Sequence, residues 1–219
     1  MPRCYKNAKP LIYVFCEGES EQAYTDFLKK KFSDVAVIKR PSSTGLFDEA
    51  DNRFKKDPKY RNSAEVTDEI WFFYDVETKD RDNWNKWMKI IKQLRSLRRK
   101  PNIRVRLLMT TGCIEYWLML HFKMFAPPLL SVADKERMLA EVISREPTYE
   151  KGNYPATARI AEKYPTAVVN AAKTVKNLLP EGLPGLDDTD ERNRWLHTST
   201  KTFSTVYEAI EYLEALGKS

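Results

Sequence analysis

The sequence contains little of what characterises secreted, membrane-spanning or zinc-stabilised proteins. Cysteine is scarce: Cys4, Cys16 and Cys113 are odd in number and unrelated in spacing, which argues against a disulfide framework and against a zinc ribbon. No apolar run is long enough to cross a bilayer. The basic N-terminus is followed only by the short apolar run Leu11 to Cys16, which ends at Glu17 and not at a small-residue cleavage site. We therefore expect reduced, apolar cysteines in a cytoplasmic protein that has no membrane partner.

The composition is that of a globular protein with a basic excess. The 219 residues, of which 42% are hydrophobic and 31% charged, can build one large domain with a continuous core, and they contain no internal repeat. The formal net charge is +6 and the pI is about 9.1. This balance favours an anionic partner such as nucleic acid.

Much of the basic excess lies on one stretch between Lys86 and Arg106. Its cations recur three or four residues apart and alternate with apolar side chains, which predicts an amphipathic helix. The cations are Lys86, Lys89, Lys92, Arg95 and Arg99, and the apolar residues are Trp84, Trp87, Met88, Ile91 and Leu94. Two interpretations stay open: a solvated face opposite a core face, or a nucleic-acid contact made by the last four of these cations.

Strands and helices alternate over residues 1–128, which predicts an α/β core. Apolar runs indicate strands at Leu11–Cys16, Val35–Ile38, Ile70–Tyr74 and Ile103–Met109, and we expect the last of them to be partly exposed or near a sheet edge. Helical patterns cover Glu21–Phe32, Leu46–Lys56, the basic stretch and Ile114–Phe125. Ser20 can cap the first of these helices.

Residues 129–219 carry helical patterns and no strand signal. The expected helices are Ala133–Ser144, Ala156–Lys163, Thr166–Leu179 and Ser204–Leu216, with breaks at Pro147, at Pro165 and across the residues 180–190, which are rich in Pro, Gly and Asp. His197 is expected in a loop before the last helix. We expect this helical C-terminal part to pack on the core as a layer or to cover the active site.

Carboxylates follow two of the expected strands. Glu17 comes after the first strand and Asp75 after the third, and the ligands of open α/β sheets gather beyond such strand ends. Asp75 and Glu77 occupy alternate positions of an extended segment, so both can face one side and share a hard cation such as Mg²⁺ or Mn²⁺. The alternative is that such acids are turn residues or helix caps. We prefer that interpretation for Asp80 and for Asp82, which is placed to cap the basic helix.

Three segments together resemble the RloB-like family, a branch of the Toprim superfamily. They are Cys16 to Glu21, Tyr74 to Glu77 and Cys113 to Phe122, and their order and spacing agree with the family over nearly the whole chain. Tyr149 to Lys151 and Ser204 to Tyr207 are similar to two shorter elements of the family. The resemblance implies a Toprim-like, mostly parallel sheet flanked by helices, with a C-terminal helical extension.

The same resemblance implies an activity and a setting. These are magnesium-dependent cleavage of DNA or RNA, transfer RNA included, and a bacterial anti-phage or restriction-linked defence system with an RloA-like ATPase partner. By position, Glu17 matches the glutamate that acts as general acid or base or completes the metal site. Asp75 and Glu77 match the paired acids that hold the metal. The usual pair is Asp-x-Asp, and the extra methylene of Glu77 keeps the charge but changes its reach.

Further candidates come from the third segment and from a loop. Glu115 and His121 match the family signature as catalytic residues, but residues six apart on a helix cannot share one face closely. Glu115, near the helix start, either faces the strand ends or complements the helix dipole. His121 is either a core imidazole or a catalytic group. Lys151 is a candidate phosphate contact.

Three classes of function therefore stay open. The first is a metal-dependent nuclease, the second is a non-catalytic nucleic-acid-binding or regulatory subunit of an ATPase complex, and the third is an enzyme that acts on nucleotides. Binding to a polymer falls steeply with ionic strength, whereas binding to a small nucleotide depends on it much less. The sequence determines neither the choice between DNA and RNA nor the oligomeric state.

Overall fold

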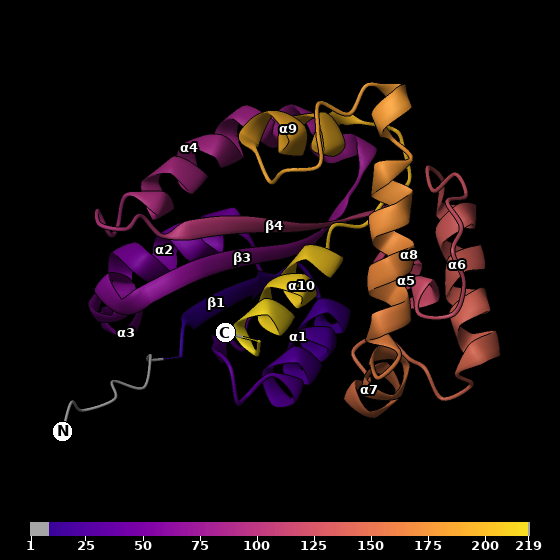
Figure 1. Cartoon of the computed structure of the whole chain (residues 1–219), viewed down its shortest axis with the longest axis horizontal. Helices are drawn as coiled ribbons and strands as arrows, with labels where there is room; N and C mark the ends of the chain where they lie inside the picture. Colours follow the sequence, from indigo (N-terminus) through magenta and orange to yellow (C-terminus); the bar gives the residue numbers. More distant parts are fainter. Residues whose placement is uncertain (1–8, 219) are drawn as a thin grey trace.

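The computed structural model describes residues 9–218, and the strands of this part form a four-stranded sheet. The strands are β1 (Leu11–Cys16), β2 (Val37–Lys39), β3 (Thr67–Val76) and β4 (Arg104–Thr111), in the spatial order β2-β1-β3-β4. All pairings between them are parallel, so the carboxyl ends of the strands meet at one edge (Figure 1). This confirms the expected α/β class with a parallel sheet flanked by helices.

The side chains of β3 alternate between two helical layers because successive residues of a strand point to opposite faces. Phe72 stacks on Phe47 of α2 (Phe47–Lys56), with 4.2 Å between the ring centroids. The next residue, Phe73, meets Tyr24 of α1 (Glu19–Lys31) edge-on on the other face, at 6.1 Å. β3 is therefore a central strand that is buried on both sides, which explains its unbroken apolar and aromatic run.

Helices cover both faces of the sheet (Figure 1). α3 (Pro58–Ser63) and α4 (Trp84–Arg95) join α2 on one face, while α5 (Ile114–Leu120) and α10 (Tyr207–Leu216) join α1 on the other. The outer helices α6 (Val132–Arg145) and α8 (Tyr164–Lys176) pack on α5. The outer helix α7 (Tyr154–Ala161) packs on α1, and α9 (Asp190–Thr198) lies against α4. Three 3₁₀ turns are η1 (Ala64–Val66), η2 (Thr78–Asn83) and η3 (Leu179–Glu181).

A short segment of the C-terminal part covers the outer edge of β4. Ser204 bridges Thr110 in the antiparallel sense, and the Thr205 N–H donates to the Met109 carbonyl at 2.8 Å. The Thr205 hydroxyl donates to the Leu107 carbonyl at 2.8 Å and accepts the Met109 N–H at 2.9 Å. β4 is the edge strand, as predicted. The expectation of partial exposure is wrong for most of its length, because this segment pairs with its open edge.

Tertiary contacts explain where the element boundaries differ from the sequence expectation. The last helix begins at Tyr207 and not at Ser204, because the preceding residues bond to β4. α5 ends at Leu120, before Phe125. His197 lies in α9 and not in a loop, and Thr189 caps this helix by accepting a backbone N–H at 3.2 Å.

Neither of the two predicted helix caps forms. α1 begins at Glu19 with Gly18 at the N-cap position, so Ser20 lies inside the first turn and its hydroxyl instead accepts the Gly152 N–H at 3.1 Å. η2 runs directly into α4, and Asn83 rather than Asp82 takes the N-cap position, without a side-chain cap. The continuous helical backbone leaves no extended residue there from which a side chain could cap α4.

The cysteines that the structure describes are reduced and buried, as expected. Cys16 and Cys113 are buried free thiols, whereas Cys4 lies outside the described residues. Burial raises the pKa of Cys16 to about 12, so this thiol stays protonated at neutral pH. Within residues 9–218, every helix is too short or too polar to span a membrane.

Candidate functional site

Five carboxylates from four parts of the chain line one pocket at the carboxyl edge of the sheet. They are Glu17 after β1, Glu19 and Glu21 in the first turn of α1, Asp75 near the end of β3 and Glu115 in the first turn of α5. With Lys151 they border a pocket of about 270 Å³, which we call the acidic pocket. The parallel topology brings them together, because β1 and β3 are neighbours and α1 and α5 each begin just after a strand at this edge.

Glu17 is held in place by the backbone of β3. Its N–H donates to the Phe73 carbonyl at 3.0 Å, and its carboxylate Oε2 accepts the N–H of Asp75, also at 3.0 Å. Burial raises the pKa of Glu17, and repulsion from Asp80 and Glu77 adds to this effect, whereas the hydrogen bond from Asp75 opposes it. The carboxylate is therefore fixed beside Asp75 in an environment that favours its protonated form.

Asp75 sits in an electrostatically unfavourable place. None of the described residues gives its buried Oδ1 atom a hydrogen bond. Burial raises the pKa of Asp75 well above its usual range, and the charges of Glu21, Glu17 and Glu115 raise it further. Burial likewise raises the pKa of Glu21 to about 7. The acidic pocket therefore gathers more negative charge than its own hydrogen bonds balance.

Residues 149–152, which we call the capping loop, fold over the acidic pocket. The Tyr149 hydroxyl donates to Glu115 Oε1 at 3.2 Å, and Lys151 Nζ lies 3.9 Å from the same oxygen. Gly152 donates its N–H to Ser20 Oγ at 3.1 Å from a backbone with φ of +76°, a conformation that favours glycine. The segment Tyr149 to Lys151, which resembles a short family element, thus lies at the pocket, and Lys151 can contact an anion there.

Glu77 turns away from the acidic pocket although it is only two residues from Asp75. Its carboxylate pairs with Lys135 and, at 2.6 Å, with Lys79, and it lines a separate pocket. Burial opposes the effect, but hydrogen bonds from Lys135 and Lys79 lower the pKa of Glu77. Of the three predicted metal ligands, the structure therefore brings Glu17 and Asp75 together and leaves Glu77 apart.

Both histidines lie in the interior, bonded to other groups. His121 Nδ1 lies 3.0 Å from the Trp117 carbonyl and its Nε2 lies 3.1 Å from the Tyr24 hydroxyl. Burial lowers the pKa of His121 to about 4. His197 Nε2 lies 2.9 Å from the Asp80 carbonyl. The structure does not bring His121 to the acidic pocket, and this placement fits the core imidazole of the two interpretations.

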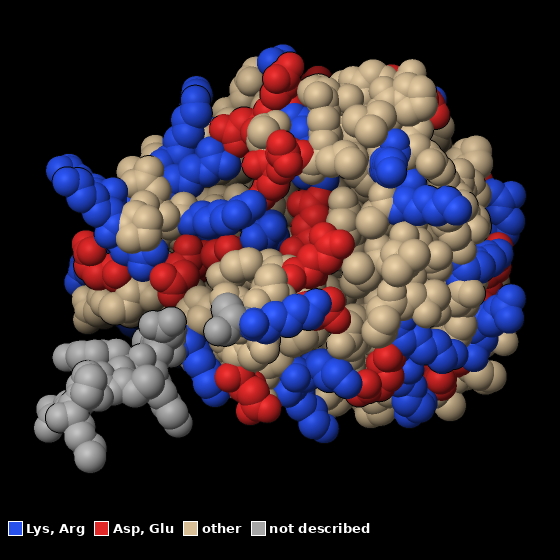
Figure 2. Space-filling view, in the orientation of Figure 1, with Lys and Arg blue, Asp and Glu red and all other residues tan. Residues whose placement is uncertain are grey.

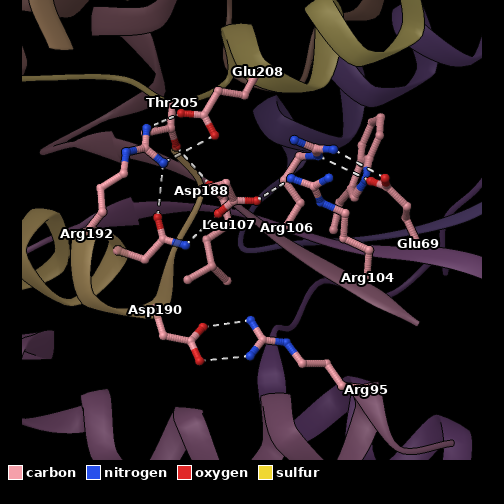
Figure 3. A network of polar contacts seen from close by, with 12 residues as sticks. Glu69, Arg95, Arg104, Arg106, Leu107, Asp188, Asp190, Arg192, Thr205 and Glu208 are labelled. Carbon is pink, nitrogen blue, oxygen red and sulfur yellow. Dashed lines mark hydrogen bonds and ion pairs between the residues drawn. The ribbon is translucent and has the colours of Figure 1, made fainter. Parts of the chain in front are cut away.

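The basic helix α4 runs away from the acidic pocket. The helix begins after η2, at the carboxyl edge of the sheet, and ends with Arg95 at the opposite edge. There the Arg95 carbonyl accepts the N–H of Ile103, the residue before β4. Arg95 is paired with Asp190 through hydrogen bonds of 2.9 and 2.7 Å (Figure 3). Lys89 and Lys92 are exposed. Arg99 lies beyond the helix, where the chain reverses toward β4, which corrects its predicted place on the helical face.

The predicted core face of α4 is confirmed, with Trp84, Ile91 and Leu94 buried. On its outer face Lys86 pairs with Asp48 at 2.6 Å. These contacts agree with the solvated-face interpretation, and the nucleic-acid role of the exposed cations stays a prediction.

A larger cavity, of about 690 Å³, lies over the amino-terminal half of β4 between α8 and α10. Figure 2 shows a band of acidic side chains in the hollow at the centre of this face, with Lys and Arg side chains beside it. The two arginines in its wall already have partners, Arg104 with Asp188 at 3.1 Å and Arg106 with Glu69 at 3.2 Å (Figure 3). These pairs join β4 to its surroundings, so the strand ends hold the better candidate site.

Three residues at the acidic pocket were not predicted as site residues: Glu19 and Glu21, which line it, and Tyr149 of the capping loop. Glu21 lies four residues after Glu17, in the first turn of the helix that follows the strand. This spacing places the two side chains on one side, and it was the feature of the sequence that could have indicated Glu21. Tyr149 reaches Glu115 across 34 residues of chain. No local pattern connects the two, because their contact depends on how the C-terminal helices pack.

The fold and the pocket define a class: an α/β protein with a parallel sheet and a carboxylate cluster where the strands end. The sequence profile of the family described as RloB-like protein matches residues 12–213. The chain belongs to the RloB-like family. No curated protein and no solved structure matches it.

Proposed function

We propose that this protein is a magnesium- or manganese-dependent nuclease of the Toprim type that cleaves phosphodiester bonds at the acidic pocket. The observation that carries the proposal is Asp75, whose buried Oδ1 lies among other carboxylates and receives no hydrogen bond from the described residues. Carboxylates gathered in this way repel one another, and a divalent cation removes that repulsion. Carboxylate oxygens are also the ligands that Mg²⁺ and Mn²⁺ prefer.

The acidic pocket fits such a cation as a partly hydrated ion. Asp75 would hold it together with Glu17 or Glu21. Within residues 9–218, no three His, Cys, Asp or Glu side chains are arranged to enclose a metal by themselves, but Mg²⁺ usually takes one or two carboxylates and keeps several waters. When bound, the cation polarises a phosphoryl oxygen and stabilises the negative charge of the transition state. Glu77, tied to two lysines, is not in the proposed ligand set.

The residues of the acidic pocket divide the remaining tasks. Glu17 is anchored by the Asp75 N–H and has a raised pKa, so it suits the transfer of a proton to or from the reacting groups. Lys151 is two-thirds exposed beside the pocket and suits contact with a substrate phosphate. Glu115 positions the capping loop through its bond from Tyr149.

The family resemblance supports a proposal for the setting. We place the nuclease in the bacterial cytoplasm, in an anti-phage or restriction-linked defence system that includes an RloA-like ATPase. The proposed substrate is DNA or RNA, with transfer RNA among the candidates. The net charge of +6 supports an anionic polymer as the partner.

A second candidate function is a non-catalytic nucleic-acid-binding subunit of an ATPase complex. The position of Glu77 favours it, because the ion pairs with Lys79 and Lys135 remove one of the three predicted acids from the metal site. This alternative predicts binding of nucleic acid without metal-dependent cleavage.

Cleavage and metal binding by Asp75→Asn test the proposal together. Labelled single-stranded DNA, duplex DNA and transfer RNA are incubated with the protein in Mg²⁺, in Mn²⁺ or in EDTA. We expect cleavage only with metal, and a loss of about a hundredfold or more in Asp75→Asn, because a charged oxygen ligand is gone. Calorimetry should show weaker Mg²⁺ binding by the variant.

Glu65→Gln is the matched control, since it neutralises an exposed carboxylate that precedes β3 at the opposite edge of the sheet. It should bind Mg²⁺ and cleave like the wild type. Unchanged Mg²⁺ affinity in Asp75→Asn would overturn the metal site. Wild-type protein that binds nucleic acid but never cleaves it would favour the non-catalytic alternative.

A further inference from the structure

A second, positively charged pocket lies beside the acidic pocket at the same edge of the sheet. Its floor includes Val76, Thr111 and Gly112 at the ends of β3 and β4. Its charged side chains are Lys79 and Arg81 of η2, Lys135 of α6, and Glu77. We call this the basic pocket. Three cations face one carboxylate there, so it carries an excess of positive charge.

Arg81 and Lys79 have hydrogen-bonding capacity to spare in the basic pocket. Arg81 donates one bond from Nη2 to the Ser199 carbonyl at 3.3 Å, while no described residue accepts from its buried Nε. Lys79 pairs with Glu77, but its side chain is 70% exposed and can turn toward another anion. A buried guanidinium N–H without an acceptor is costly. Arg81 lines the basic pocket, where its guanidinium suits an anionic oxygen as a further acceptor.

The size of the basic pocket limits what it can hold. Its volume is about 150 Å³, equivalent to roughly five waters at the liquid value of ~30 Å³ each. That space admits a phosphate group. Arginine and lysine are the side chains that recognise phosphate, arginine through its planar array of N–H donors.

The basic and acidic pockets are separated by one step along β3. Asp75 faces the acidic pocket and Glu77 faces the basic pocket, and two residues of extended chain span roughly 7 Å. The charges of the two pockets interact across this step. The positive charge of Lys79 favours the ionised form of Glu17, and that of Lys135 favours the ionised form of Asp75. A single strand of nucleic acid places consecutive phosphates at a comparable spacing, so one strand can occupy both pockets.

We propose that the basic pocket binds a backbone phosphate of the nucleic acid next to the phosphate that is cleaved at the acidic pocket. Lys79, Arg81 and Lys135 hold this neighbouring phosphate, and Glu77 is their internal counter-ion in its absence. The proposal rests on the proposed function for its substrate class. It assigns substrate binding to the strand ends rather than to α4, whose Arg95 and the nearby Arg99 lie at the opposite edge.

Binding in EDTA tests the basic pocket without requiring metal or cleavage. The anisotropy of a short fluorescein-labelled single-stranded DNA, and of the equivalent RNA, is measured against protein concentration at several salt concentrations. The test protein carries Arg81→Gln and Lys135→Gln. The matched control carries Lys56→Gln and Lys59→Gln, which remove the same charge from exposed positions of α2 and α3.

We expect the basic-pocket variant to bind about tenfold more weakly at low salt, and its salt slope to fall by about 1.4 units, roughly 0.7 for each lost contact with a single strand. The control should bind like the wild type. The variant Glu77→Gln should bind severalfold more tightly in EDTA, because Lys79 and Lys135 lose their internal partner.

Several results would overturn the proposal. They are equal loss in the pocket variant and the control, loss in the control alone, and no binding by the wild-type protein. A mononucleotide that binds as tightly as the oligonucleotide, with the same sensitivity to these variants, would assign the pocket to small nucleotides instead. Circular dichroism checks the fold, and Lys79→Gln with Lys135→Gln replaces the pair if Arg81→Gln unfolds the chain.

The nuclease proposal fails separately from this one. If the pocket variant loses affinity in EDTA while the wild type never cleaves in metal, the phosphate site stands and the catalytic assignment falls. If Asp75→Asn abolishes cleavage while the pocket variant binds normally, the reverse holds.

Discussion

Two carboxylates that lie two residues apart at the end of β3, Asp75 in the strand and Glu77 just after it, have opposite properties, although their chemistry is nearly the same. Burial among other acids raises the pKa of Asp75, whereas hydrogen bonds from two lysines lower the pKa of Glu77 against the effect of burial. The difference lies in the partners that the tertiary structure supplies. A residue's role at this sheet edge therefore follows from which pocket its side chain enters.

Glu21 should make the stability of the metal-free protein depend on pH. Burial raises its pKa from 4.5 to about 7 in the folded chain. The folded state therefore retains a proton that the unfolded state releases, and this contribution to stability is lost as the pH rises from about 4.5 to about 7. Glu21→Gln removes the dependence, so the variant should exceed the wild type in stability at pH 8 by on the order of 2 kcal/mol, and match it near pH 4.

Urea denaturation in EDTA at the two pH values measures this difference. Glu65→Gln, which alters an exposed carboxylate, should follow the wild type at both. A stability difference between Glu21→Gln and wild type that is the same at both pH values would show that packing, and not ionisation, distinguishes them.

At the scale of elements, short segments without regular structure complete the sheet and the pocket. Residues 204–206 cover the edge of β4, which leaves β2 as the other edge strand of the described sheet. The capping loop joins α1 to α5 over the acidic pocket through Ser20 and Glu115. Both segments belong to the helical part of the sequence, and both contact strands or helices that are distant along the chain.

Thr205→Val tests the contribution of the segment on the β4 edge. The Thr205 hydroxyl bonds to Leu107 and to Met109, so its removal leaves a buried carbonyl and a buried N–H each without that partner. We expect a loss of about 2 kcal/mol in the free energy of unfolding. Thr198→Val, which removes an exposed hydroxyl bonded to a carbonyl of its own helix, should cost well under 1 kcal/mol.

The measurement is equilibrium unfolding in urea, with both variants compared at one pH. Equal losses in Thr205→Val and Thr198→Val would mean that backbone pairing alone holds the segment on β4.

At the scale of the whole molecule, ion pairs connect the C-terminal helices to one another and to the core (Figure 3). Arg192 of α9 and Glu208 of α10 form a pair in which the side chains are 1% and 11% exposed. Arg95 of α4 and Asp190 of α9 form a pair that is 30% and 45% exposed. Each pair joins two different helices. Because one pair is buried and the other is partly exposed, the loss of each should change the free energy of unfolding by a different amount.

Truncation of each arginine should reveal that difference. Arg192→Ala leaves the Glu208 carboxylate buried without its partner, so we expect a loss of about 3–5 kcal/mol in stability. Arg95→Ala breaks a partly solvated pair and should cost less than about 1 kcal/mol. Thermal and urea unfolding of the two variants measures both values. A small effect of Arg192→Ala would mean that water reaches Glu208 when the guanidinium is removed.

The distribution of charge over the molecule explains why net charge alone did not locate the candidate site. Figure 2 shows Lys and Arg side chains spread among acidic ones on this face, and many cations are paired internally. The proposed substrate contacts, Lys151 and the basic pocket, are few and lie at the strand ends.

The sequence by itself determined the α/β class, the four strands, most helices and the carboxylates Glu17 and Asp75, because apolar periodicity and strand-end positions are local properties. The family resemblance added Glu115. Only the tertiary structure decided that Glu21 joins these acids, that Glu77 turns to the lysines and that His121 is enclosed in the core. It also decided that α4 carries its last cations away from the acidic pocket. These outcomes depend on contacts between residues far apart in the chain, and local spacing holds no information about which of them form.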